Sequence, residues 1–167
     1  EESGMEAMLH YSLEPEIYNF RSLQMLLKAI TSFGTLQESE ILIHLKLDTG
    51  MHRLGFEESD LEDLCKILQD SPQIRVQSVF SHLVGSDDPG LDAFTRHQIS
   101  LFSQMTETLE KRLGYGFLRH ILNSAGIARF PEAQFSMVRL GISLYGISSD
   151  PEEQKMLETV TSLKTSI

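Results

Sequence analysis

The chain has 167 residues, of which 41% are hydrophobic, and its formal net charge is −10 at pH 7. This length suits a single domain with a substantial core. The charge argues against nucleic acid as a partner, because an acidic surface repels phosphate backbones and no cluster of Lys and Arg compensates locally. Apolar runs are too short for a membrane span, and no secretory signal pattern opens the chain. The single cysteine, Cys65, cannot form an intrachain disulfide, so a cytoplasmic location is expected.

The first half of the chain alternates between predicted strands and helices. Residues 7–13 are predicted to form a strand. Apolar side chains at helical spacing predict a helix over residues 21–33, and Gly34 is a natural stop for it. Apolar and polar side chains alternate along 41–48, which is typical of a strand with two different faces. A second amphipathic helix is predicted over 58–70.

The second half continues the alternation. The pattern predicts a buried strand over 74–83, a loop rich in Gly, Asp and Pro over 85–91, and a long helix over 92–113 that is capped by Gly114. Two further strands are predicted over 117–123 and 135–145. A short charged helix or linker follows from 150 onward, and residues 160–167 are strand-like.

This order of elements predicts an α/β fold with a parallel sheet of about five strands. A complete (β/α)8 barrel needs about 250 residues. The chain is therefore expected to be either a small open α/β sheet or the larger part of a barrel. Polar side chains at four successive strand ends favour the partial barrel, because the binding residues of such barrels collect at the carboxyl ends of the strands.

These candidate site residues fall into four groups, one at each predicted strand end. They are Lys46, Asp48 and Arg53, then Ser81 and His82, then His120, Asn123 and Ser124, and finally Arg139, Gly141 and Ile142. A small hydroxyl and backbone N–H groups can approach an anion closely. The last two groups therefore predict a phosphate cradle.

Four motifs in order resemble those of the alanine racemases, which are enzymes of fold-type III that depend on pyridoxal 5'-phosphate (PLP). The run Lys46-Leu-Asp-Thr-Gly-Met-His-Arg-Leu-Gly-Phe56 resembles the signature KxDTGMxRLGF of that family. The other three motifs are Phe80-Ser-His82 with Phe94 and Gln98, His120-Ile-Leu-Asn-Ser-Ala125 for HxxNSA, and Phe135 to Gly146 for FxMVRxGIxxYG. One departure is His52, at a place where glycine is common.

The resemblance implies a partial (β/α)8 TIM barrel, covering about strands 4–8 with their helices. Residues 1–148 would form part of the PLP-binding barrel domain. Residues 149–167 would form a linker leading toward a C-terminal β domain. The complete protein is expected to be a homodimer that interconverts L- and D-alanine for peptidoglycan synthesis.

The resemblance also implies how the cofactor would be bound. His82 would lie against the PLP ring, and Arg139 would hydrogen-bond the pyridine nitrogen. A guanidinium can only donate, so it would leave that nitrogen unprotonated. His120 would orient Arg139. The residues around the phosphate would be Asn123, Ser124, Gly141 and Ile142.

Lys46 and Arg53 would support the reaction from the first motif. Arg53 would reach the PLP phenolic oxygen and the substrate carboxylate side. A bare ammonium at Lys46 would be repelled by Arg53. In the family this lysine is often carbamylated, which turns it into an anion that can pair with the arginine.

Racemisation in this family needs two bases on opposite faces of the substrate α-carbon. The lysine of the family's KANAYG motif and the tyrosine of its C-terminal domain are both missing here, so the chain alone is expected to be an inactive fragment. A barrel fragment has two open sheet edges, which predicts either edge-to-edge association of two copies or a tail that covers one edge.

Other interpretations stay open from the sequence. The complete protein could be a serine or broad-spectrum amino-acid racemase, or the chain could be a non-catalytic barrel domain in a larger cell-wall enzyme, such as one fused to a peptidoglycan ligase. Lys46, His82 and Arg139 could instead have structural roles. No metal site is expected, because His44, Asp48 and His52 lack a regular ligand spacing.

Overall fold

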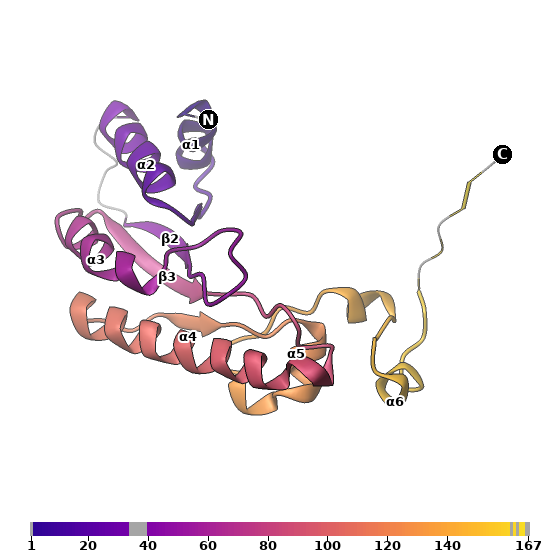
Figure 1. Cartoon of the computed structure of the whole chain (residues 1–167). Helices are drawn as coiled ribbons and strands as arrows, with labels where there is room; N and C mark the ends of the chain where they lie inside the picture. Colours follow the sequence, from indigo (N-terminus) through magenta and orange to yellow (C-terminus); the bar gives the residue numbers. More distant parts are fainter. Residues whose placement is uncertain (1, 34–39, 161, 163, 166–167) are drawn as a thin grey trace.

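The computed structural model describes residues 2–33, 40–160, 162 and 164–165, and its centre is a parallel sheet (Figure 1). The strands are β1 (Glu16–Ile17), β2 (Ile41–Lys46), β3 (Ile74–Phe80) and β4 (Leu118–His120), adjacent in chain order. Each neighbouring pair is parallel. The α/β fold with a parallel sheet is therefore confirmed. The described residues contain four strands rather than the predicted five.

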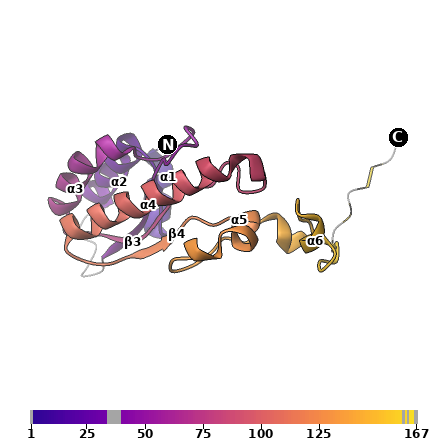
Figure 2. The same ribbon diagram turned by 60° about the horizontal axis from the view of Figure 1, so that its bottom comes forward.

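Helices alternate with these strands. They are α1 (Glu2–His10), α2 (Phe20–Phe33), α3 (Leu61–Gln69), α4 (Asp92–Leu113), α5 (Ser124–Arg129) and α6 (Pro151–Gln154), with short 3-10 segments at Glu58–Asp60, Pro89–Leu91, Pro131–Ala133 and Ile142–Tyr145. Figure 2 shows α2, α3 and α4 together on one side of the strands. The predicted helices over 21–33, 58–70 and 92–113 are confirmed to within a few residues. Gly114 ends α4 with a φ of 76°, as a C-terminal cap does.

The two faces of the sheet have different roles. Ile43 and Leu45 of β2 are completely buried in the core, while His44 and Lys46 alternate with them and point to the opposite face. The core includes apolar side chains of the helices, among them Leu26, Leu64 and Phe102. The face away from the helices is therefore the one that presents polar groups.

The strand predicted over residues 7–13 is wrong, because most of that segment belongs to α1. Met5 and Leu9 are four residues apart, so they share one side of a helix, and both contact the core. The first strand comes later, at β1, where Ile17 is completely buried. A strand of two residues leaves no alternating pattern to detect.

The strand predicted over 135–145 is also wrong. Two backbone N–H groups of this segment donate toward the β4 region, Ser136 to Arg119 and Arg139 to Leu122. These two donors are three residues apart, whereas the hydrogen bonds between parallel strands recur every two residues along a strand. The segment therefore does not pair with β4 as a strand. The segment then turns into a 3-10 helix at Ile142–Tyr145. In the predicted stretch 160–167 the described residues form no strand, and the others lie outside the described part, as does Gly34.

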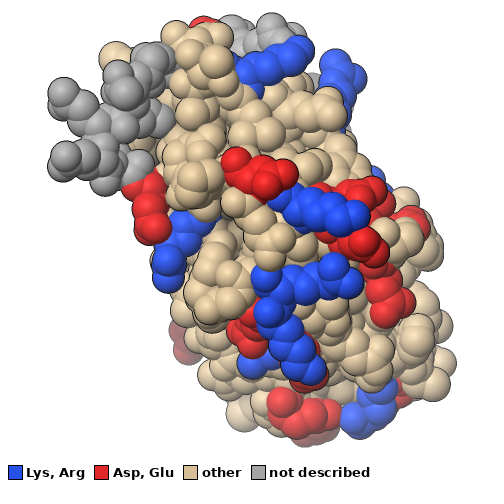
Figure 3. All heavy atoms as spheres, turned by 90° about the vertical axis from the view of Figure 1, so that its left-hand side faces the viewer, with Lys and Arg blue, Asp and Glu red and all other residues tan. Residues whose placement is uncertain are grey.

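Charged side chains of both signs are scattered over the face shown in Figure 3, among larger areas of other residues. Ion pairs such as Lys66 with Glu62, at 2.9 Å, form on the helix surfaces. Among the described helices, none combines the length and apolar character that a bilayer crossing requires.

Candidate functional site

The predicted site residues of three strands meet at the carboxyl end of the sheet. The register pairs Lys46 with Phe80 and Phe80 with His120, which places the last residues of β2, β3 and β4 in one row. The Lys46 Nζ lies 5.3 Å from the Phe80 ring centroid. The His120 ring stacks on the same ring at 5.1 Å with an interplanar angle of 2°.

Arg139 lies above this row and is held by several acceptors. Its Cζ is 5.1 Å from the Phe80 ring centroid. The guanidinium donates to the backbone oxygens of Ser81 and His120 and to the Nδ1 of His120. Burial lowers the pKa of Arg139, and Glu16 opposes that effect. A guanidinium remains charged in proteins, so Arg139 is a permanent cation of the site. Its hydrogen bonds hold the guanidinium group in one orientation.

His82 follows β3 and is half-buried beside the same cation. Burial lowers the pKa of His82, and the positive charges of Arg139, Lys46 and Arg53 lower it further. The imidazole is therefore neutral at pH 7. A neutral, flat ring suits contact with another ring better than it suits anion binding.

A cavity of about 600 Å³ opens next to these residues. This volume is within the range of small-molecule sites. Six of the predicted cofactor residues line it, namely His82, Asn123, Ser124, Arg139, Gly141 and Ile142. The fold thus brings together residues that are up to 60 positions apart in sequence.

Hydrogen-bond donors converge at one end of the cavity. The buried Ser124 Oγ accepts from the backbone N–H of Gly141 at 2.9 Å and of Ser143 at 3.2 Å. The Ser143 Oγ is buried and, among the described residues, has no hydrogen-bond partner. An unpaired buried hydroxyl costs free energy, and Ser143 directly follows Ile142 of the cavity lining, so an acceptor oxygen that reached it would supply the missing partner.

Asn123 contributes in another way. Its Oδ1 accepts from the backbone N–H of Gly126 at 3.0 Å and from the Ser86 hydroxyl at 2.7 Å. Its Nδ2 donates to the Leu83 oxygen at 3.3 Å. The side chain therefore caps α5 and fixes the loop after β3, which shapes the cavity.

Lys46 and Arg53 differ in their surroundings. Lys46 is only 8% exposed, and its Nζ lies 3.9 Å from Glu16 Oε1. Arg53 is exposed, and the described residues supply it with no hydrogen bond or ion pair. Between them, Asp48 Oδ1 accepts from the backbone N–H of Gly50 and His52 and so fixes the turn.

Three residues of the site were missed by the sequence analysis: Glu16, Phe80 and Ser143. Phe80 lies within the second of the four motifs, and its place at a strand end was the available signal. Ser143 follows Ile142 directly and could have been included in the phosphate cradle. Glu16 belongs to a two-residue strand, which the sequence pattern does not reveal.

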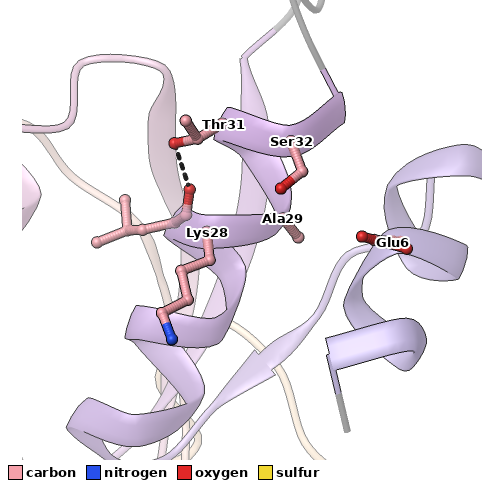
Figure 4. A pocket seen from close by; sticks show the side chains of 6 residues that line it. Glu6, Lys28, Ala29, Thr31 and Ser32 are labelled. Carbon is pink, nitrogen blue, oxygen red and sulfur yellow. Dashed lines mark hydrogen bonds between the residues drawn. The ribbon is translucent and has the colours of Figure 1, made fainter.

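A second cavity, of about 420 Å³, lies between α1 and α2 (Figure 4). Glu6 faces it from α1, and Lys28 and Thr31 line it from the last turns of α2. The Thr31 hydroxyl donates to the Leu27 backbone oxygen within its own helix. This part of α2 precedes the start of β2, so the cavity lies away from the carboxyl ends where the predicted residues meet. Among the described residues, no group of three metal-binding side chains is present either.

The sequence profile described as "Alanine racemase, N-terminal domain" matches residues 1–149. The chain belongs to this alanine racemase family. The alanine racemase of Clostridium tetani is 35% identical over 171 aligned residues, which cover 99% of this chain and 43% of that protein. Alanine racemase 1 of Oceanobacillus iheyensis is also 35% identical, over 85% of this chain and 36% of that protein.

Solved alanine racemases share the fold of this domain. The enzyme of Streptomyces lavendulae has a TM-score of 0.80 at 28% identity, covering 93% of this chain and 41% of that one. A Bartonella henselae structure, described with covalently bound pyridoxal phosphate, has a TM-score of 0.70 at 21% identity, over 86% and 37% of the two chains. The fold is thus part of the alanine racemase TIM barrel. The chain spans about two fifths of the length of these relatives.

Proposed function

We propose that this chain is the PLP-binding barrel part of an enzyme that interconverts L- and D-alanine. The observation that carries the proposal is the cavity lined by six predicted cofactor residues, one of which is the fixed cation of Arg139. Family membership supports the reaction type. PLP acts as an electron sink for the substrate when it is bound.

The cavity fits a ring that carries a phosphate. Ser124 and the unpaired Ser143 hydroxyl, with the backbone N–H groups of Gly141 and Ile142, would bind the phosphate, for which the Gly141 N–H would exchange its present acceptor, the Ser124 hydroxyl. The neutral His82 would pack on the ring. Arg139 would donate to the pyridine nitrogen and leave it unprotonated, because a guanidinium donates hydrogen bonds without giving up its proton. A weaker electron sink restrains side reactions.

Lys46 and Arg53 would act at the opposite side of the ring, toward the phenolic oxygen. We propose carbamylation of Lys46 as a hypothesis that rests on the family resemblance. Glu16, at 3.9 Å, already provides a carboxylate for an unmodified ammonium. The mass of the complete protein, measured without acid so that a carbamate is kept, decides: the mass of one added CO2 supports the hypothesis, and an unmodified mass rejects it.

The two bases of racemisation would come from other parts of a complete homodimeric enzyme. We assign residues 1–148 to the barrel part and 149–167 to a linker. On this proposal the chain alone binds PLP without racemising alanine. A rate of alanine interconversion by the purified chain with PLP above a protein-free blank would contradict it.

Binding of PLP to this chain can be followed through the ³¹P NMR signal of the phosphate. We expect wild-type chain to shift and broaden that signal, and Ser124→Ala to weaken binding about tenfold, since a hydrogen bond to a charged group contributes about 1.5 kcal/mol. Ser103→Ala on the exposed side of α4 is the control and should bind normally. No response with wild-type chain would reject the proposed site. Assays of the complete enzyme on alanine and serine then test the substrate.

A further inference from the structure

A continuous row of hydrogen bonds crosses the sheet behind Arg139. The guanidinium contacts His120 Nδ1, and His120 Nε2 lies 3.2 Å from Ser78 Oγ on β3. Ser78 Oγ lies 2.6 Å from His44 Nδ1 on β2, and His44 Nε2 lies 2.8 Å from Glu14 Oε2. Five side chains therefore connect the site to the residues before β1.

The chemistry of the two ends fixes the direction of every bond in the row when both imidazoles are neutral. Arg139 can only donate, so His120 Nδ1 accepts, and the hydrogen of the neutral imidazole is on Nε2. That N–H donates to Ser78. At the other end, the Glu14 carboxylate only accepts, so His44 carries its hydrogen on Nε2. His44 Nδ1 then accepts from the Ser78 hydroxyl.

We propose that Ser78, His44 and Glu14 are positioning residues for Arg139, which hold His120 in the single tautomer that can accept from the guanidinium. The role in catalysis rests on the proposed function, whereas the row itself does not depend on PLP. None of the three residues touches the cavity. They act through His120.

Burial of the row favours one tautomer of His120 over the other. Ser78 is 1% exposed and His120 is 6% exposed, so water does not replace a missing partner easily. With the hydrogen on Nδ1, His120 would point a donor at the Arg139 donor and leave Nε2 facing Ser78 as an acceptor. Burial first, then Arg139 and His44, lower the pKa of His120 to about 4, which keeps the ring neutral. The row requires such a neutral ring, in which one nitrogen donates a hydrogen bond and the other accepts one.

The tautomers can be read directly by NMR on the chain labelled with ¹⁵N histidine and arginine, without PLP. At pH 7 we expect His120 to be protonated on Nε2 and bare on Nδ1, and His44 to carry a hydrogen on Nε2. We also expect separate, slowly averaging Nη–H signals for Arg139. A hydrogen on Nδ1 of His120 would overturn the proposal.

Variants of Ser78 separate positioning from packing. Ser78→Ala should let the Arg139 Nη–H signals average and should shift the His120 nitrogens, whereas Ser78→Thr keeps the hydroxyl and should restore both. A folded Ser78→Ala chain with unchanged Arg139 and His120 signals would overturn the proposal. If Ser78→Ala does not fold, Glu14→Ala provides the test, because the Glu14 side chain is 43% exposed and its loss leaves the core intact. It should shift the His44 signals, and Glu40→Ala, which removes an exposed carboxylate from outside the row, should not.

PLP titration of the same variants links the row to the site. We expect Ser78→Ala to weaken PLP binding about fivefold and Ser78→Thr to bind like wild type, since one neutral hydrogen bond contributes about that factor. Normal affinity in a Ser78→Ala chain whose Arg139 signals average would overturn the positioning role. Failure of the wild-type chain to bind PLP would reject the proposed function. The NMR result on the tautomers would still test the proposed row of hydrogen bonds.

Discussion

At the scale of single residues, His52 occupies a strained backbone position. Its φ is 53°, in the left-handed region that glycine adopts freely. The departure from the family pattern at this residue therefore has a local cost. Its side chain is 76% exposed, and its Nδ1 lies 3.6 Å from Asp48 Oδ2, which offsets little of that cost.

The stability of variants at residue 52 should follow how well each residue type tolerates a positive φ. We expect His52→Val to lower the free energy of unfolding by about 1–2 kcal/mol, because a β-branched residue is least tolerant of positive φ. His52→Gly removes the same side-chain contact and should be at least as stable as wild type. Urea denaturation measures both. Equal stability of the Val and Gly variants would contradict the backbone explanation.

His120 should make the stability of the chain depend on pH. Its pKa in the folded chain is about 4, below the ordinary value of 6.5, chiefly because of burial. Between these values the unfolded chain binds a proton that the folded chain does not, so the free energy of unfolding falls as the pH falls from about 6.5 to 4. The full effect of this shift is about 3 kcal/mol.

Denaturation curves at pH 7.0 and 4.5 measure this dependence. In His120→Gln the residue cannot titrate, so the loss of stability between the two pH values should be smaller than in wild type. His97→Gln, on the exposed side of α4, should keep the wild-type loss. An unchanged pH dependence in His120→Gln would show that His120 is not the group responsible.

At the scale of elements, the loop after β2 closes tightly on the strand. The backbone N–H of Asp48 donates to Phe56 at 2.8 Å, and that of Phe56 donates to Lys46 at 2.9 Å. Gly55 lies inside this closure with a φ of 132°. A Cβ at Gly55 would lie 2.5 Å from the Asp48 nitrogen. The loop therefore needs glycine both for its backbone angle and for space.

Gly55→Ala should destabilise the chain by at least about 2 kcal/mol, because backbone atoms cannot yield as a flexible side chain does. Gly116→Ala is a matched control, since its added Cβ would meet no heavy atom within 4 Å and its φ is outside the left-handed region. Thermal denaturation compares the two. A Gly55→Ala chain as stable as the Gly116→Ala chain would contradict the predicted clash.

The elements also explain how far the sequence could predict the structure. Long helices such as α4 were predictable because their apolar positions repeat over many turns. The strand predicted over 135–145 failed because extended, apolar residues form a strand only where their hydrogen bonds repeat with a neighbour. In the site, residues at strand ends were predictable from parallel topology. The contact between His44 and Ser78 was not, because strand register depends on tertiary packing.

At the scale of the whole molecule, the sheet edges are short. β1 has two residues and carries the charged Glu16, and β4 is partly covered by Ser136 and Arg139. Among the described residues after α6, Val160 donates to the Tyr145 oxygen and so contacts the segment before α6, not a sheet edge. Short, charged or partly covered edges are poor templates for pairing.

Exposed apolar side chains are instead concentrated after Arg139. Five large ones are between 41% and 62% exposed within eight residues, namely Leu140, Ile142, Leu144, Tyr145 and Ile147. Clustered apolar exposure of this kind favours association. We therefore expect the average mass of this chain in sedimentation to rise with concentration, and Leu144→Lys to reduce that rise, because Leu144 is the most exposed of the five.

Leu118→Lys distinguishes this association from pairing of sheet edges. Leu118 is 42% exposed at the start of β4, and a lysine on an edge strand opposes strand addition. If the apolar segment drives association, Leu118→Lys should associate like wild type while Leu144→Lys does not. The reverse result would mean that the edge of β4 is the contact, and a constant monomer mass at all concentrations would mean that neither surface associates.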